Sequence, residues 1–468
     1  MLQFLLILSV ACVHLYDTVE PVRLATRRHP EETAFLVFAL FACLGFGYWV
    51  IQVVCGWLVD RGDGSAFRLA GATGVGVRAA GLASLVYSVY VWGWPDAVRA
   101  YVGDLILVDE IIACLPFWCL IAWMWWAQHP IERRAKEATL HRRIADESLV
   151  QPFESRGASV WTNFRQQALV WLLPILMLAA WSEGLDKGVE ALGAPGSLAV
   201  VEVVRLVGSL VILAIAPAGV RRTWKTVELG EGPLRSRIRS VVDAYRIRTR
   251  GPFVWSAPDD SVNAAVVGFV FPVRYLLVSR AMLESFEDRP LAAVIAHEVA
   301  HLKLHHMVWL GLTVLAAVGA CGWAVTLLDA FVPDLRPFLG EVPVSIATLL
   351  AVFLTFGVVS RRFEWQADAF AVRHVAVRID RSERIDAAAC EAMSAALAQV
   401  AFSNAIRMTQ WSWRHGSLAE RIRRVRSLIG APAAKMFSID RQVVLIRVVT
   451  IITIILSYAP LLWQHLPG

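Results

Sequence analysis

The stretch Ala296-His297-Glu298-Val299-Ala300-His301 decides the fold of this 468-residue chain, because it sets two histidines four positions apart with a glutamate beside the first. Side chains four apart lie on one face of a helix, so His297 and His301 are expected to hold one Zn²⁺ per chain. Glu298 is then placed to act as a general base. The stretch predicts the zinc site of a peptidase.

A second acidic stretch, Glu364-Trp365-Gln366-Ala367-Asp368, follows further along the chain. Catalytic zinc needs a third protein ligand and an open position for water, and Glu364 is the obvious carboxylate to complete the set. Asp368 lies one helical turn later on the same face, where it is expected to hold a ligand histidine by a hydrogen bond. The alternatives are a solvated Glu364 that pairs with neighbouring arginines and an Asp368 that is an ordinary surface acid.

Composition places this site in a membrane protein. The chain is 57% hydrophobic and only 18% charged, and its mean hydropathy of +0.55 is far from that of an average soluble domain. Apolar stretches long enough to cross a bilayer predict about nine spans. These are Leu2–Tyr16, Ala34–Val59, Ala79–Trp94, Leu105–Trp126, Ala168–Trp181, Leu198–Val220, Val308–Val332, Val344–Val359 and Val443–Trp463.

Basic residues orient these spans. Arginine and lysine clusters follow the fourth, sixth and eighth spans, and such ends usually face the cytoplasm. Arg23, Arg27 and Arg28, between the first two spans, disagree with this orientation. We attribute the net charge of +6 to these basic residues at cytoplasmic span ends rather than to nucleic-acid binding. The expected partners are therefore a lipid bilayer and a protein or peptide substrate, and the oligomeric state is left open.

Spans and motifs divide the chain into five parts. Residues 1–220 form an N-terminal membrane domain of about six spans. Residues 221–307 and 361–441 are two halves of one α+β peptidase domain at the cytoplasmic face, separated by a transmembrane hairpin at 308–360. Residues 442–468 form a C-terminal transmembrane helix. We expect a small sheet before the motif, a motif helix that continues into the seventh span, and an eighth span that extends unbroken through Phe370.

Five stretches carry a resemblance to a known family. They are Asn263-Ala264-Ala265, Leu276-Leu277-Val278-Ser279, the segment from Ala293 to His301, the segment from Ser360 to Asp368, and Ser417-Leu418-Ala419-Glu420-Arg421-Ile422. Together, over about residues 230 to 430, they resemble the membrane-bound gluzincins of the HtpX and CAAX prenyl protease type. The fold expected is an α-helical polytopic membrane protein with a gluzincin-type zinc peptidase domain.

The resemblance also implies roles for single residues. His297, His301 and Glu364 would be the zinc ligands, Glu298 the base and Asp368 the support of a ligand. A substrate peptide would lie as an added strand along Asn263, Ala264 and Ala265.

The C-terminal stretch departs from the family pattern. The family commonly has His-Pro before its Glu-Arg-Ile segment, whereas this chain has His415-Gly416-Ser417. We expect His415 as a catalytic residue near the metal or the oxyanion, with Arg421 as another candidate donor; a solvated loop histidine is the alternative. His305 and His306 are expected to be interfacial histidines, and a second metal contact is the alternative.

These observations predict a zinc endopeptidase of a bacterial inner membrane, with the site facing the cytoplasm. Its substrates would be membrane-associated or unfolded proteins, as in membrane protein quality control. Prenylated CAAX substrates are less favoured, because no stretch indicates a prenyl pocket. Two other classes of protein remain: a sensor-transducer metalloprotease related to β-lactam receptors, and a membrane scaffold with an inactive site.

Overall fold

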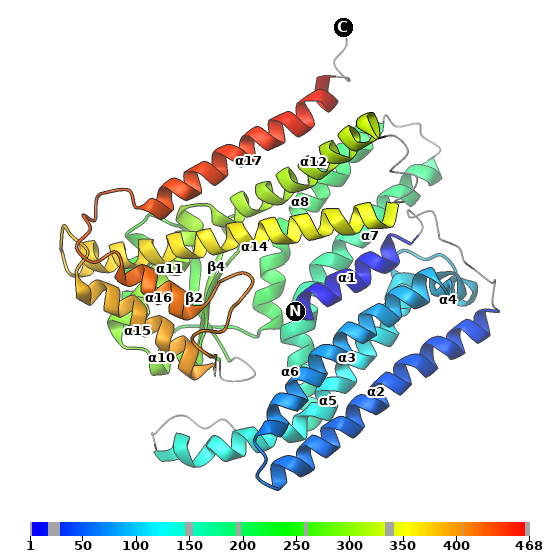
Figure 1. Cartoon of the computed structure of the whole chain (residues 1–468), viewed down its shortest axis with the longest axis horizontal. Coiled ribbons are helices and arrows are strands. Elements are labelled where there is room, and N and C mark those ends of the chain that lie inside the picture. The colour runs from blue at the N-terminus through cyan, green and yellow to red at the C-terminus, as the bar shows by residue number, and fades with distance from the viewer. Residues whose placement is uncertain are drawn as a thin grey trace. The chain divides into compact units, whose positions relative to one another are not determined.

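A computed structural model describes residues 2–16, 29–145, 153–192, 198–256, 261–332, 341–404 and 406–463. They form two compact units, Met1–Lys225 and Thr226–Gly468. The first unit is helical (Figure 1). Its helices are α1 (Leu2–His14), α2 (Pro30–Asp60), α3 (Ser65–Tyr90), α4 (Trp94–Val102), α5 (Val108–Ala145), α6 (Arg156–Asn163), α7 (Val170–Leu192) and α8 (Leu198–Thr223), with a π-helical turn η1 (Phe164–Leu169) before α7.

Among the described residues, seven helices are long and apolar enough to cross a membrane. They are Pro30–Asp60, Ser65–Tyr90, Val108–Glu137, Arg156–Ala191, Val200–Thr223, His306–Phe331 and Ser438–Ala459. The other two expected spans are also helical. One is α1, which at 13 residues is short for a bilayer, and the other lies within α14. The count of nine spans therefore stays a prediction, and Arg23, Arg27 and Arg28 lie outside the described residues.

The second unit contains a four-stranded sheet of order β1-β2-β4-β3. Its strands are β1 (Val227–Glu228), β2 (Arg250–Trp255), β3 (Ala264–Val267) and β4 (Tyr275–Ser279). β2 and β4 are parallel, whereas the two outer strands pair antiparallel with their neighbours. The small sheet expected before the motif is thus present, and β3 forms one of its edges.

The helices of this unit are α9 (Pro233–Asp243), α10 (Arg280–Ser285), α11 (Asp288–Lys303), α12 (His306–Phe331), α14 (Glu341–His374), α15 (Ala387–Ser403), α16 (Leu418–Arg426) and α17 (Ser438–Trp463), with a π-helical turn η2 (Val375–Ile379). The core joins the sheet to α11, α14 and α15 through Leu276, Val278, Ile295, Val299, Val372 and Leu397. Burial of each such large aliphatic side chain contributes about 1.5–3 kcal/mol, which fixes α11 firmly against the sheet.

The helix α11 ends at Lys303, contrary to the expectation that it continues into the seventh span. Leu304 caps it, and His305 adopts the left-handed conformation with φ 55°. A left-handed residue terminates a helix and redirects the chain. The new helix α12 then begins at His306. The four-residue spacing of His297 and His301 therefore does not predict where His305 and His306 lie.

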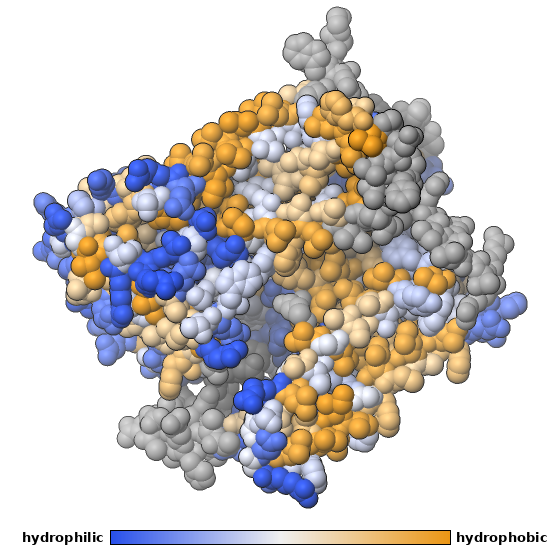
Figure 2. Space-filling view, in the orientation of Figure 1, coloured by the Kyte–Doolittle hydropathy of each residue, from blue (hydrophilic) through white to orange (hydrophobic). Residues whose placement is uncertain are grey.

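The helix α14 runs unbroken from Glu341 to His374, so the eighth expected span and its extension through Phe370 form one helix. It packs against α11, α12 and α17. Figure 2 shows hydrophobic side chains along α12 and α17 and hydrophilic ones gathered over α15 and α16. The unit therefore joins a polar half to an apolar helical half.

Candidate metal centre

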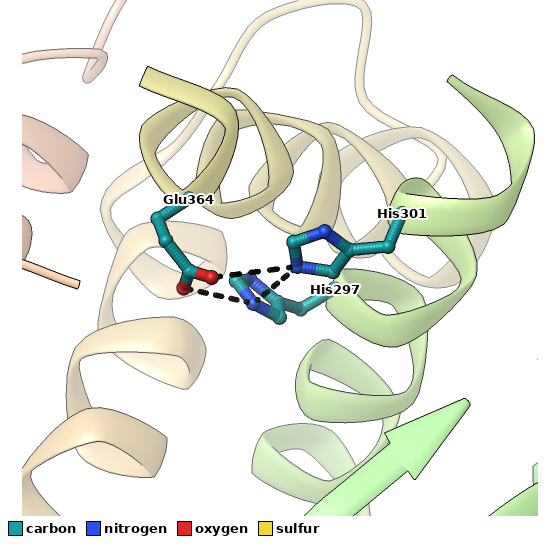
Figure 3. A group of neighbouring side chains, drawn as sticks. All are labelled: His297, His301 and Glu364. Carbon is teal, nitrogen blue, oxygen red and sulfur yellow. Dashed lines mark hydrogen bonds and ion pairs between the residues drawn. The ribbon is translucent and has the colours of Figure 1, made fainter. Parts of the chain in front are cut away.

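Two helices bring the three expected ligands together (Figure 3). The Nε2 atoms of His297 and His301, on α11, lie 3.3 Å apart. Glu364, on α14, approaches both: Oε2 lies 3.6 Å from His297 Nε2 and Oε1 lies 3.8 Å from His301 Nε2. Two imidazole nitrogens and one carboxylate that face a common point are the donor set of catalytic zinc sites, which leave a fourth position open. The residues present therefore fit a zinc ion.

Asp368 stands behind the first ligand, where the sequence analysis expects it. Its Oδ1 lies 3.0 Å from Nδ1 of His297. Asp368 in turn accepts two hydrogen bonds from Arg421, of 2.8 and 2.6 Å. Burial alone would raise the pKa of Asp368, but the Arg421 guanidinium lowers it below its ordinary value. Asp368 therefore stays ionised and can fix the orientation of His297.

Arg421 also contacts Glu364, with Nη1 3.3 Å from Oε2. Its side chain is buried, and its guanidinium group is bonded to Asp368 and faces Glu364. Its hydrogen bonds go to Asp368 and its ion pair to Glu364, and its expected role as an oxyanion donor stays a prediction. The structure assigns it a supporting position.

His306 contacts the second ligand, and sequence spacing does not predict this contact. Its Nδ1 lies 3.1 Å from Nδ1 of His301. With 2% of its surface exposed, His306 is buried within the protein, and its expected position at the bilayer interface stays a prediction. The left-handed turn at His305 brings His306 back toward His301. Helical spacing could not reveal this contact, because the turn breaks the phase.

Glu298 lies between the metal ligands and the edge strand β3. Its Oε2 accepts a hydrogen bond of 3.3 Å from the backbone N–H of Val266. Desolvation by the surrounding protein raises the pKa of Glu298 to about 7. A carboxylate whose pKa lies near neutrality can both accept and return a proton, which is the property that a general base needs.

The direction of the peptide groups in β3 shows which residues face its free edge. The peptide carbonyl of Asn263 faces β4, because it accepts a hydrogen bond from the N–H of Ser279 on that strand. Antiparallel pairing alternates, so Ala265 also faces β4, whereas Ala264 and Val266 face outward. Of the expected edge residues Asn263, Ala264 and Ala265, only Ala264 therefore directs its peptide groups outward.

The side chain of Asn404 already pairs with this edge. Its Oδ1 accepts a 2.9 Å hydrogen bond from the N–H of Val262, and its Nδ2 donates a 3.0 Å bond to the carbonyl of the same residue. An amide side chain that pairs in this way imitates the peptide group of a neighbouring strand. The outward N–H groups of Val262 and Val266 thus already have side-chain partners, Asn404 and Glu298.

His415 reaches the metal ligands from the segment between α15 and α16. Its Nδ1 lies 3.1 Å from Oε1 of Glu364, and its side chain is 44% exposed. An antiparallel bridge between Ser412 and Gly416 folds this segment back, and Gly416 has a φ of +72°, which glycine adopts without strain. His415 therefore contacts the metal-binding group on one side and solvent on the other.

Aromatic packing holds the same segment on α14. Trp413 stacks on Phe353 with the ring centroids 3.7 Å apart, and its carbonyl accepts a 2.8 Å hydrogen bond from Arg361. Gly357 makes room for the indole, because a Cβ there would lie 2.2 Å from Nε1 of Trp413. These contacts fix the residue two positions before His415.

Part of this chain is similar to known proteins. Residues 228–429 match peptidase family M48. A CAAX prenyl protease 1 homolog of Arabidopsis thaliana is 30% identical over 179 residues, and one of Oryza sativa subsp. japonica is 29% identical over 177 residues. Each match covers 35% of this chain and 42% of the plant protein.

A crystal structure of S. mikatae Ste24p is also similar, at 15% sequence identity and a TM-score of 0.44, over 83% of this chain and 99% of that chain. The family resemblance carried by the sequence motifs is confirmed by the match to peptidase family M48.

Proposed function

Because residues 228–429 match peptidase family M48, we propose that this chain is a zinc-dependent membrane endopeptidase that hydrolyses extended peptide segments. One observation carries the proposal. The Nε2 atoms of His297 and His301 converge with Glu364, and Glu298 lies beside them at the free edge of β3. In this proposal, Glu298 acts as the base between the metal-binding donor set and the strand edge that holds the peptide.

Each residue of the site has a defined task in this mechanism. Bound zinc would lower the pKa of water and polarise the peptide carbonyl. Glu298 takes a proton from the attacking water and returns it to the leaving amine. His415 donates a hydrogen bond to the oxyanion, because it lies at the site and remains open to solvent. Asp368 holds His297 in the orientation that directs Nε2 toward the metal.

Metal removal gives the direct test of this function. The detergent-solubilised full chain should contain one zinc and cleave casein, and a chelator should abolish the cleavage. Added zinc should restore it, because the ligands belong to a folded domain. Zinc without cleavage of casein or of any other substrate would instead favour the sensor-transducer or scaffold class. A protein that binds no zinc would contradict the proposal.

Substrate binding along β3 can be tested without changing the protein. In an added strand, every second peptide N–H faces the neighbouring strand. N-methylation at each successive amide of one cleaved peptide should therefore lower kcat/KM with a period of two residues. Each sensitive position should cost about tenfold, the worth of one lost hydrogen bond. A uniform response along the peptide would rule out this binding mode.

The cellular setting completes the proposal. We place the zinc site at the cytoplasmic face of a bacterial inner membrane, where membrane-associated or unfolded proteins would reach it. The two plant relatives are named for CAAX prenyl protease activity, so prenylated CAAX peptides are the second substrate class. Cleavage rates for matched peptides with and without a prenyl group distinguish the two classes.

A further inference from the structure

A chain of buried polar contacts connects the metal site to the last helix of the unit. It begins at His301, whose Nδ1 lies 3.1 Å from Nδ1 of His306. Nε2 of His306 lies 3.0 Å from Oε1 of Gln366, on α14. Nε2 of Gln366 donates a 2.8 Å hydrogen bond to Oδ1 of Asp440, in the first turn of α17. Three residues thus join a zinc-facing histidine to α17.

The carboxylate of Asp440 decides the direction of every bond in this chain. A carboxylate only accepts, so Gln366 turns its amide N–H₂ toward Asp440 and its Oε1 toward His306. His306 then carries its proton on Nε2 and accepts through Nδ1. His301 must in turn carry its proton on Nδ1, which leaves its Nε2 lone pair free. This is the tautomer that a metal ligand through Nε2 requires.

Each member of the chain is held firmly. His306 and Gln366 are buried, and the imidazole of His306 stacks on Phe363 at 4.5 Å with the rings 3° from parallel. Asp440 also accepts a 3.0 Å hydrogen bond from the N–H of Phe437 and lies 3.4 Å from Arg373. The anion at the end of the chain is therefore fixed by donors besides Gln366.

A second polar contact joins α17 to the end of the motif helix. Arg447 donates a 2.7 Å hydrogen bond from Nη2 to the carbonyl of Leu304, the residue that caps α11. This contact lies beside the left-handed turn that directs His306 toward His301. The start of α17 thus holds both the turn and the polar chain that begins there.

We propose that His306, Gln366 and Asp440 form a positioning relay that sets the tautomer and orientation of His301, so that α17 is part of the metal site. The relay holds the imidazole of His301 in its ligand orientation, as Asp368 holds the imidazole of His297. It rests on the proposed zinc binding, but not on any substrate. The relay residues raise metal affinity by holding the ligand in advance of binding.

Two substitutions at His306 test the direction of the bonds. A glutamine there can accept from His301 through its oxygen and donate to Gln366 through its nitrogen, whereas a leucine can do neither. His306→Leu should bind zinc about 10–100-fold more weakly than the wild type, and His306→Gln should stay close to it. The readout is zinc affinity, measured on metal-free full-length protein by competition with a chromophoric chelator. Equal affinity in His306→Leu and the wild type would overturn the relay.

A matched pair of glutamine substitutions guards against misfolding of the His306 variants. Gln366→Met breaks the relay, whereas Gln399→Met makes the same change in α15, where Gln399 bonds Ser403. Only Gln366→Met should weaken zinc binding. The Tm of the metal-free proteins distinguishes a relay defect from a packing defect. A relay defect lowers zinc affinity while the Tm stays near that of Gln399→Met, whereas a packing defect lowers both. Equal affinities in the two variants would refute the relay alone, whereas a wild type without zinc would refute the proposed function.

Discussion

Glu298→Gln should lower the rate of peptide hydrolysis by about 10³-fold while zinc content stays at the wild-type value. Glutamine has the same size, and its oxygen can still accept the N–H of Val266. It cannot take a proton from water, so only the chemical step is lost. We would measure kcat on an unfolded protein substrate and zinc by atomic absorption on the same purified sample.

His415→Leu is the comparison variant for this result, because leucine has no hydrogen-bond donor. His415 lies near Glu364 but is not among the three converging ligands, so its loss should leave zinc bound and lower kcat by about 10²-fold. The expected order of kcat is thus wild type, His415→Leu and then Glu298→Gln, at constant zinc. Turnover of Glu298→Gln near the wild-type rate would mean that another group is the base.

Local spacing was enough to predict the centre of the site. His297 and His301 face one point because α11 is a regular helix where they occur, and residues four apart then share a face. Glu364 and Asp368 follow the same rule on α14, which runs unbroken through both. These positions depend only on helix geometry and on the meeting of two helices that one hairpin connects.

The rest depends on contacts that no local pattern encodes. A left-handed turn at His305 brings His306 to His301, although no proline or glycine within residues 300–310 indicates a break there. Asn404 pairs with Val262 from 142 positions away, and Arg421 reaches Asp368 across 53 positions. Polar partners of this kind are set by tertiary packing, so sequence spacing alone could not assign them.

Arg421 makes the strongest such contact, and its removal should have the largest effect on stability. It is buried between Asp368 and Glu364, with bonds of 2.6 and 2.8 Å to the first and a 3.3 Å contact to the second. Removing one partner of a buried ion pair leaves an uncompensated charge, which costs about 3–5 kcal/mol. Arg421→Met should therefore lower the Tm of the solubilised protein and its zinc content together.

Matched variants separate this effect from a general loss of helix α16. Arg423 lies exposed on the same helix, so Arg423→Met should leave the Tm and the zinc content near their wild-type values. The double variant Arg421→Met with Asp368→Asn should recover part of the lost stability, because it removes one carboxylate along with its partner. Its asparagine can still accept from His297, so zinc binding should recover in part as well. A double variant no more stable than Arg421→Met would show that the guanidinium stabilises the fold by packing and not by neutralising the carboxylates behind the metal site.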